Sequence, residues 1–381
     1  MRIANLFRKK YTTIGLNKFI DDQSIFMFIS LSDMAAVDLV GITIFEKDLD
    51  GEIICSWIYP SVSAELKRYF IGKCNFVLSE HDQITFYYGH IQTFWYYVSV
   101  SKEDSITKKK IKDVYIFTIS NSFNPEFHEV LGKEFLKSYT FGMSSILNQY
   151  LSIYTKGFCT RCDSSMLTAE KFDQFKAYSQ TCIKELITLF GMEIVLLYIS
   201  MLLKKRIVIY APKLQMLLDI CRSMPALTYH RLNWNIVYPH MSLNDTNDIN
   251  TLKKQRTYVA GFTEAGLENR NDLYDLFINV SDTEVVINPD SKEYFQMSKL
   301  HKDIATYLVQ TSQDDDIGDD DIIKGLIKKT KDIIDGLKNM DSENHSNPGV
   351  SMDLLKSKNL SKTMQSFLFN LASAEGLVKI I

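Results

Sequence analysis

"LITLFGMEIVLLYISMLLKKRIVIYAP", residues 186–212, is the most apolar stretch of the chain, and it decides between a membrane protein and a soluble core. A transmembrane helix needs about 20 predominantly apolar residues. Glu193 lies near the centre of the run, where an acidic side chain costs about 3 kcal/mol on insertion scales. After Lys204, Lys205 and Arg206, the short run "IVIY" is typical of a buried strand. An apolar helix leading into such a strand indicates the centre of a covered sheet, so we expect a core element.

The overall composition is that of a folded chain with material for two domains or one large one. Among its 381 residues, 46% are hydrophobic and 12% are aromatic, which is enough for a sizeable core. The formal net charge of -3 argues against a dedicated nucleic-acid binder, which would carry a basic excess. The six cysteines form no repeating framework, and with no secretory signal they indicate reduced thiols in the cytoplasm.

Residues 1–33 read as a basic arm outside the fold. The stretch "MRIANLFRKKYTTIGLNKF" has five basic residues and no acidic residue. We expect a disordered arm or the product of an upstream start codon. A mitochondrial transit peptide is the alternative, although its usual serine and arginine content is thin here.

Residues 34–155 are expected to form a first lobe with an antiparallel sheet flanked by helices. Five strand-like runs follow one another up to residue 120, and "DLDG", residues 48–51, is a turn signal that predicts a hairpin between the first two. Helical spacing appears in "SAELKRYFIGKC" and again after "NPEF", where Pro125 suits the first position of a helix. This pattern is typical of an α+β lobe.

The remainder of the chain has a different rhythm. Residues 156–177, which begin within "TKGFCTRCDSSMLTAE", break the pattern, and we expect a linker there. In residues 178–381 strand-like runs alternate with helical ones, which favours a mostly parallel sheet covered by helices, an α/β lobe. Apolar stripes at helical spacing then predict a helical C-terminal part, for example at Ile304 and Leu308.

The chain carries no motif that predicts covalent chemistry. "GFTEAG", residues 261–266, has two glycines of a phosphate-binding loop, but Leu267 and Glu268 stand where lysine and serine or threonine are needed. The pair Cys159 and Cys162 has metal-ligand spacing without a second pair, and His230 has no nucleophile near it in the sequence. We therefore expect no catalytic residue, no metal and no cofactor, and a protein that acts through its surface.

Three segments of the chain resemble the DENN family. "LLYISMLLKKRIVIYAPKLQMLLDICRSMPALTYHRLNWNIVYPHMSLN" and "YVAGFTEAGLENRNDLYDLFINVSDTEVVI" are similar to its central and downstream parts. "LVGITIFEKDLDGEIICSWIYP" is similar to its longin-like first lobe, and the likeness, which is to the short, single-module members, extends from residue 36 to the C-terminus. The arm and the polar loop near residues 342–349 are departures from the family pattern.

The resemblance implies a longin-like lobe followed by an α/β DENN lobe, and a guanine-nucleotide exchange factor rather than an enzyme. The implied partner is a Rab family small GTPase, and the implied place of work is the cytoplasmic face of late or multivesicular endosomes, with peripheral membrane contact at most. A non-catalytic adaptor, held by coiled-coil subunits of the Commander endosomal recycling assembly, is the alternative. No nucleic acid is implied.

Five residues are candidates for the partner interface, because arginine and aromatic side chains are enriched among interface anchors. Arg231 and Trp234 lie in the predicted loop after the second helix of the α/β lobe, and Asn269, Arg270 and Asp272 lie in "ENRNDLYD". A buried core indole is an equally good interpretation of Trp234. A capped turn is the structural alternative for "NRND".

Overall fold

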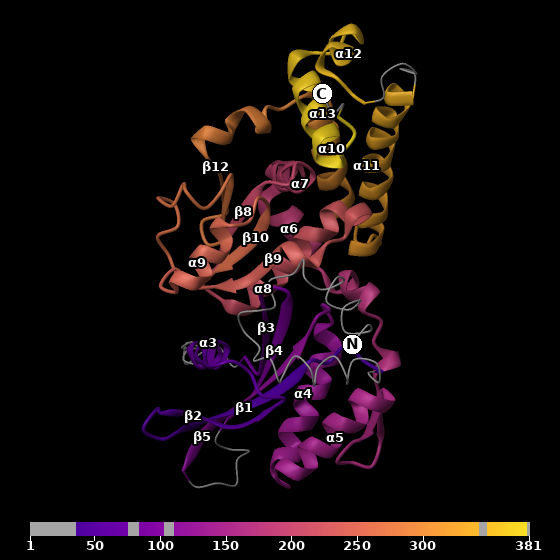
Figure 1. The fold of residues 1–381 in the computed structure, drawn as a ribbon. Helices are drawn as coiled ribbons and strands as arrows, with labels where there is room; N and C mark the ends of the chain where they lie inside the picture. The colour runs from indigo at the N-terminus through magenta and orange to yellow at the C-terminus, as the bar shows by residue number, and fades with distance from the viewer. Residues whose placement is uncertain (1–35, 75–83, 103–109, 343–348, 379–381) are drawn as a thin grey trace, which may run out of the picture. The chain divides into compact units, whose positions relative to one another are not determined.

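The fold is described from a computed structural model, over residues 36–74, 84–102, 110–342 and 349–378. The basic arm expected at residues 1–33 lies outside these described residues. The chain divides into two compact units (Figure 1). Unit 1 comprises Met1–Tyr88 and Phe94–Gln174, and unit 2 comprises Gly89–Thr93 and Phe175–Ile381.

Unit 1 is built on the antiparallel sheet that the strand-like runs predict. Its strands lie in the order β2-β1-β5-β4-β3. They are β1 (Gly41–Asp48), β2 (Ile53–Tyr59), β3 (Phe86–Ile91), β4 (Phe94–Lys102) and β5 (Ile111–Ser120). The predicted hairpin joins β1 to β2, with Gly51 at a φ of 88° and the Asp48 carboxylate accepting a hydrogen bond from the Glu52 amide at 2.8 Å. A positive φ is a conformation that glycine adopts readily, so this turn is encoded locally.

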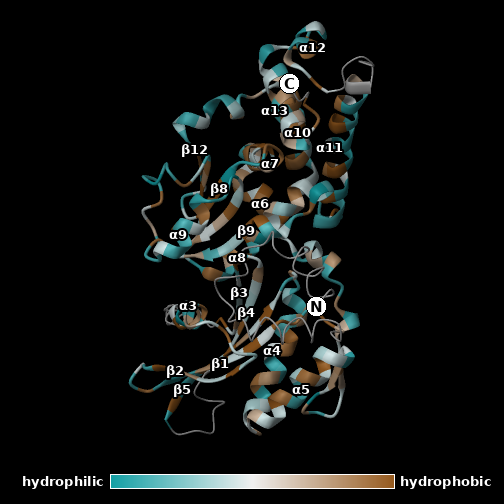
Figure 2. Cartoon of the chain, viewed as in Figure 1, coloured by the Kyte–Doolittle hydropathy of each residue, from teal (hydrophilic) through white to brown (hydrophobic). Residues whose placement is uncertain are grey.

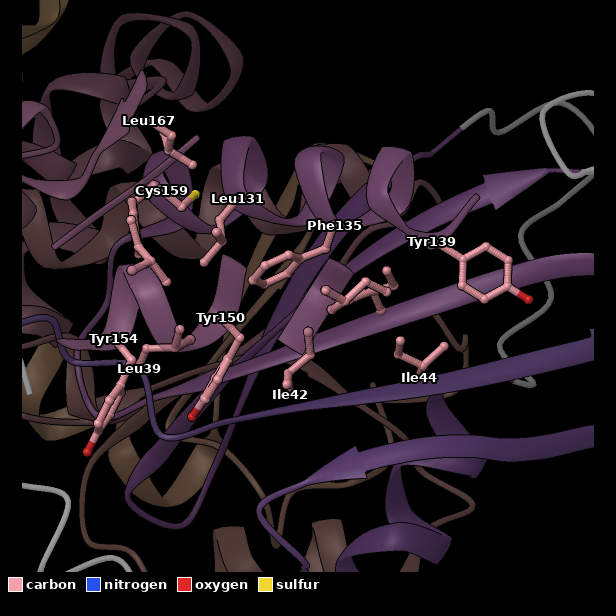
Figure 3. Packing of buried hydrophobic residues seen from close by; sticks show 14 of the residues in the cluster. Leu39, Ile42, Ile44, Leu131, Phe135, Tyr139, Tyr150, Tyr154, Cys159 and Leu167 are labelled. Carbon is pink, nitrogen blue, oxygen red and sulfur yellow. The ribbon is translucent and has the colours of Figure 1, made fainter. Parts of the chain in front are cut away.

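Helices α3 (Ala64–Cys74), α4 (Pro125–Tyr139) and α5 (Met143–Lys156) complete unit 1. Helix α4 begins at Pro125, as the sequence predicts, and buries one face whose residues are spaced four apart. This face packs in one cluster with Ile42 and Ile44 of β1 and with α5 (Figure 3). The α4 residues in this cluster are Phe127, Leu131, Phe135 and Tyr139.

Most of the segment expected as a linker, residues 156–177, is a folded part of unit 1. It forms a small hairpin from β6 (Phe158–Thr160) and β7 (Met166–Thr168), followed by the 3-10 turns η3 (Ala169–Lys171) and η4 (Gln174–Gln180). Cys159 and Leu167 point into the same hydrophobic cluster as α4 (Figure 3). The reason for the difference is that each strand contributes a single apolar core residue, too few to show a period of two.

Unit 2 contains the mostly parallel sheet that strand–helix alternation predicts. The strand order is β12-β11-β8-β10-β9. The strands are β8 (Arg206–Tyr210), β9 (Val237–Met241), β10 (Tyr258–Phe262), β11 (Leu276–Asn279) and β12 (Glu284–Ile287). Strands β8, β9, β10 and β11 run parallel, and β12 is antiparallel to β11. A Cβ at Gly261 in β10 would lie 2.5 Å from the Pro239 carbonyl oxygen, so strand packing explains this glycine without a phosphate ligand.

The apolar stretch at residues 186–212 forms most of two helices and the central strand of unit 2. Helix α6 (Ile183–Phe190) ends at Gly191, a 3-10 turn η5 (Gly191–Glu193) follows, and every residue of α7 (Ile194–Leu202) is buried. Among the described residues, Gln174–Leu202 is long and apolar enough to cross a membrane. However, 67% of its most apolar window is buried inside the chain, and β8 follows it directly, which supports the core interpretation.

The remaining elements of unit 2 connect and cover the sheet. They are α8 (Leu214–Ser223), η6 (Met224–Arg231), η7 (Trp234–Ile236), α9 (Thr246–Lys253), η8 (Pro289–Phe295), α10 (Lys299–Ser312), α11 (Asp319–Ser342), α12 (Met352–Ser357) and α13 (Lys362–Glu375). The predicted helical C-terminal part is therefore present. Its apolar stripes face inward, with Ile304, Leu326 and Leu371 buried, and Figure 2 shows hydrophobic and hydrophilic residues alternating along α11.

Two polar contacts tie this helical part to the central helices. The hydroxyls of Tyr198 in α7 and Thr330 in α11 lie 2.8 Å apart in the interior. The Asp319 carboxylate accepts hydrogen bonds from the amides of Ile183 at 2.6 Å and Lys184 at 3.0 Å, so α11 supplies the cap of α6. These contacts fix the C-terminal helices to the core of unit 2.

Candidate functional site

All five candidate residues lie at one edge of the parallel sheet, which we call the amino edge because its four parallel strands begin there. Arg231 and Trp234 come just before β9, and residues 269–272 come just before β11. The strand starts are in register, with Tyr258 of β10 opposite Arg206 of β8 and Leu276 of β11 opposite Ile207. In open α/β sheets small ligands bind at the opposite, carboxyl edge, so the amino edge is not a small-molecule crevice by topology.

Arg231 belongs to a set of paired residues that we call the Arg231 cluster, made of Lys204, His230, Arg231 and Glu375. The Arg231 Nη2 donates to the carbonyl oxygens of Met201 at 3.2 Å and Leu202 at 2.8 Å, which are among the last carbonyls of α7. Its Nε lies 3.5 Å from the Glu375 carboxylate, and His230 Nε2 lies 3.1 Å from the same oxygen. Arg231 therefore closes the end of one helix and joins it to α13.

The electrostatics of the Arg231 cluster are those of a structural pair. Burial lowers the pKa of Arg231, and the charge of Glu375 opposes that shift. Burial alone would raise the pKa of Glu375, but the hydrogen bond from His230 and the charges of Arg231 and Lys204 bring it below its ordinary value. Side-chain exposure is 19% for Arg231 and 14% for Glu375, so little of either group faces solvent.

Trp234 is half-buried at the start of η7, immediately before β9. The turn is capped by Asn233, whose side chain accepts a hydrogen bond from the Asn235 amide at 3.0 Å. The indole is neither a fully buried core residue nor an exposed anchor. Both interpretations of its role remain predictions.

Asn269, Arg270 and Asp272 lie on a surface loop, residues 267–275, that leads from β10 to β11 and buries its apolar residues Leu267, Leu273 and Tyr274. Asn269 is exposed. Arg270 and Asp272 form a two-pronged ion pair, with Nε to Oδ1 at 2.9 Å and Nη2 to Oδ2 at 3.1 Å. Lys253, at the end of α9, reaches the same Asp272 carboxylate at 3.0 Å. The hydrogen bond from Arg270, together with the contact of Lys253, holds the pKa of Asp272 well below its usual range.

Asp275, at the end of the loop, anchors it to the strand behind. Its carboxylate accepts a hydrogen bond from the Arg206 backbone amide at 2.8 Å, and Arg206 Nη2 lies 2.9 Å from Oδ1. Ser291 donates to the same carboxylate at 2.9 Å. Burial alone would raise the pKa of Asp275, but the hydrogen bonds and charge of Arg206 lower it overall. Asp275 is therefore a charged residue held in place by the start of β8.

Further hydrogen bonds hold the middle of the loop. The side-chain amide of Asn288 donates to the carbonyl oxygens of Asn271 at 2.8 Å and Tyr274 at 2.7 Å. The Tyr274 hydroxyl lies 2.8 Å from both the Glu268 carbonyl and the Asn271 side chain, and the Tyr258 hydroxyl donates to the Leu273 carbonyl. Because its backbone is tied down from behind, the loop presents Asn269 and Arg270 in a fixed geometry.

Sequence reasoning missed the residues that position this loop: Arg206, Lys253, Asp275 and Asn288. A usable signal was present for two of them. The basic runs "KKR" and "KKQR" lie at or just before the start of a strand, and parallel strands in register place such runs at one edge. Asp275 and Asn288 carried no such signal, because their partners are distant in the chain.

The other motifs occupy structural positions. Among the described residues no group of three or more histidine, cysteine or acidic side chains could hold a metal ion. Cys159 is buried in the core of unit 1, and Cys162 is exposed. An open cavity of about 640 Å³ lies at the start of α6, lined by Lys184, Glu185, Asp319 and their neighbours, and none of the five candidates lines it.

Comparison with known proteins places these features in a family. The family described as "SPA: Stabilization of polarity axis" matches residues 180–289, from the approach to α6 through β12. A Danio rerio protein named DENN domain-containing protein 10 is 32% identical over 345 residues, which cover 90% of this chain and 98% of that protein. The Mus musculus protein of that name is 34% identical over 90% of this chain and 97% of its own length. The Dictyostelium discoideum protein is 33% identical over 88% and 97%.

These identities extend over about nine-tenths of this chain and nearly the whole of each relative. The chain therefore belongs to the DENN family, alongside the proteins named DENN domain-containing protein 10.

Proposed function

We propose that this protein binds a Rab family GTPase and promotes release of its guanine nucleotide. Members of the DENN family are usually regulatory exchange factors for Rab proteins, and family membership is the observation that carries the proposal. The rigid, polar loop at residues 267–275 supports it, because it offers an arginine and an asparagine in fixed positions on an exposed edge.

Exchange of this kind requires no acid, base or metal from the exchange factor. The factor binds the nucleotide-free GTPase more tightly than the nucleotide-bound form. By thermodynamic reciprocity, it weakens nucleotide binding by the same factor. Holding the GTPase switch segments away from the positions that favour magnesium and phosphate produces this difference. A surface whose backbone is already ordered suits the task, since less binding energy is lost in ordering it.

Nucleotide release from a panel of purified Rab proteins tests the proposal. We expect the full-length protein to accelerate release of a fluorescent guanine nucleotide from one Rab or a small subset, with no effect on the others. No acceleration across the panel, together with stable co-purification with coiled-coil subunits of the Commander assembly, would replace exchange by the adaptor function.

We also propose that the protein works at the cytoplasmic face of late or multivesicular endosomes, as a peripheral protein. The support is the family to which the chain belongs, together with burial of its most apolar segment inside unit 2. In cell fractionation it should leave endosomal membranes in alkaline carbonate. Retention in the carbonate-washed pellet would contradict peripheral attachment.

A further inference from the structure

We infer that the turn at residues 253–256, with Arg270 beside it, is a docking surface for an acidic patch on the GTPase partner, and that it steers association. We call this surface the basic turn. It consists of Lys253, Lys254 and Arg256 of the turn itself and of Arg270 from the neighbouring loop. The inference rests on the proposed function and adds the chemistry of the partner to it.

The fold places the basic turn beside the 267–275 loop. The turn leaves α9 and enters β10, which is the next strand to β8 in the sheet, with Tyr258 opposite Arg206. The Thr257 hydroxyl donates to the Lys205 carbonyl at 3.4 Å, and the Lys253 ammonium lies 3.0 Å from the Asp272 carboxylate. The turn and the loop are therefore one continuous surface at the amino edge.

The charge of this surface is only partly compensated within the protein. Asp272 is shared by Arg270 and Lys253. Lys254 and Arg256 are both exposed, and within the described ranges neither side chain makes an ion pair or a hydrogen bond. Lys253 and Arg270 share one carboxylate, which neutralises part of their charge, whereas Lys254 and Arg256 are fully available for an external carboxylate.

The size of the charge favours an acidic protein over an anionic membrane. Asp275 of the loop is balanced by Arg206, and of the remaining charges four cations stand against two carboxylates, those of Glu268 and Asp272, which leaves an excess of two positive charges. At about 1 kcal/mol per basic residue near an anionic bilayer, an excess of two contributes roughly 2 kcal/mol, and polybasic membrane segments carry about 4–8 basic residues. The same charges on a rigid protein surface can raise an association rate by an order of magnitude or more.

Charge reversal in the basic turn tests the inference. The double variant Lys254→Glu/Arg256→Glu is compared with Lys328→Glu/Lys331→Glu, which makes the same charge change at two exposed lysines of α11. Thermal unfolding should be unchanged in both, since all four side chains are exposed. The readout is the association rate constant with the Rab that responds in the panel, at about 0.05 M and about 0.3 M salt.

We expect the turn variant to associate about tenfold more slowly at low salt, with the difference shrinking at high salt, and the α11 variant to match wild type. Equal rates for the two variants would overturn the inference while leaving the proposed function intact. Loss of binding to phosphatidylserine vesicles with unchanged GTPase association would overturn it in favour of a membrane surface. If wild-type protein binds no Rab in the panel, the proposed function fails and the inference fails with it.

Discussion

Two arginines at the same edge of one sheet have opposite surroundings. Arg231 donates to the carbonyls that end α7, and its side chain is 19% exposed beside a Glu375 that is 14% exposed. Arg270 forms a two-pronged pair with Asp272 on a loop, and the two side chains are 34% and 45% exposed. The first arginine joins two parts of the interior, and the second is presented to solvent by a loop that is rigid behind it.

The difference shows that an arginine with an acidic partner is not by itself an interface anchor. The two arginines differ in the groups that accept hydrogen bonds from their guanidinium N–H donors. Arg231 donates to buried carbonyls, so removal of its side chain leaves those carbonyls without this donor. Arg270 donates to the exposed Asp272 carboxylate. This ion pair contributes little to stability, and Arg270 can exchange it for a pair with a partner protein.

The largest expected effect is on stability. Arg231→Met should lower the free energy of unfolding by about 2–3 kcal/mol, because it leaves the α7 carbonyls without their side-chain donor and removes the arginine charge beside Glu375, which keeps only His230. Arg270→Met, the matched substitution on the loop, should lower it by less than about 1 kcal/mol. Urea unfolding followed by circular dichroism measures both. Equal losses for the two variants would remove the distinction.

The second-largest effect is expected for Asp275, which anchors the 267–275 loop to the start of β8. Asp275→Asn removes the charge that pairs with Arg206, and it should lower the free energy of unfolding by about 2 kcal/mol. A positioning role also predicts faster amide hydrogen exchange confined to residues 267–275. If exchange rises evenly over unit 2 instead, Asp275 supports the whole unit and does not position the loop.

The third effect is on binding alone. Arg270→Met should weaken affinity for the responsive Rab about tenfold, which corresponds to about 1.4 kcal/mol, with only a small change in the melting temperature. Lys328→Met on α11 is the control, since it removes one exposed cation elsewhere on unit 2. Affinity measured by titration calorimetry should separate the two variants. Identical affinities would exclude Arg270 from the interface.

The smallest effect concerns acid. The pKa of Asp272 is depressed in the folded state, so its contribution to stability is present above the unfolded value of about 3.9 and is lost as pH falls below it. Asp272→Asn should therefore show a shallower fall in melting temperature between about pH 5 and pH 3 than wild type. Parallel curves for the two proteins would show that the loop ion pair has no such linkage.

The sequence predicted the sheets better than the connections between them. Hydrophobic runs of strand length and the "DLDG" turn are local signals, and they predicted the β1–β2 hairpin and the central strand β8 correctly. The hairpin of β6 and β7 lies in the segment where the sequence predicts a linker, because each strand places only Cys159 or Leu167 in the core. A segment that short has no periodicity to detect.

The structure divides the candidate residues between two environments, and whether any of them contacts a partner stays a prediction. "ENRNDLYD" exposes Asn269 and Asp272 while Leu273 and Tyr274 are buried, whereas the Arg231 side chain is only 19% exposed. His230 meets Glu375 across 145 positions of sequence, a distance over which no local pattern can report a contact. The composition of a loop suggests what it could bind, whereas tertiary contacts determine which of its groups are available.

The most direct test of the account is a hydrogen-exchange map of the full-length protein with and without the nucleotide-free form of the responsive Rab. We predict protection at residues 253–257 and 267–275, and little change at the Arg231 cluster, whose groups are already paired within unit 2. Protection confined to other surfaces, with the 267–275 loop exchanging at its free rate, would contradict the claim that this edge grips the GTPase.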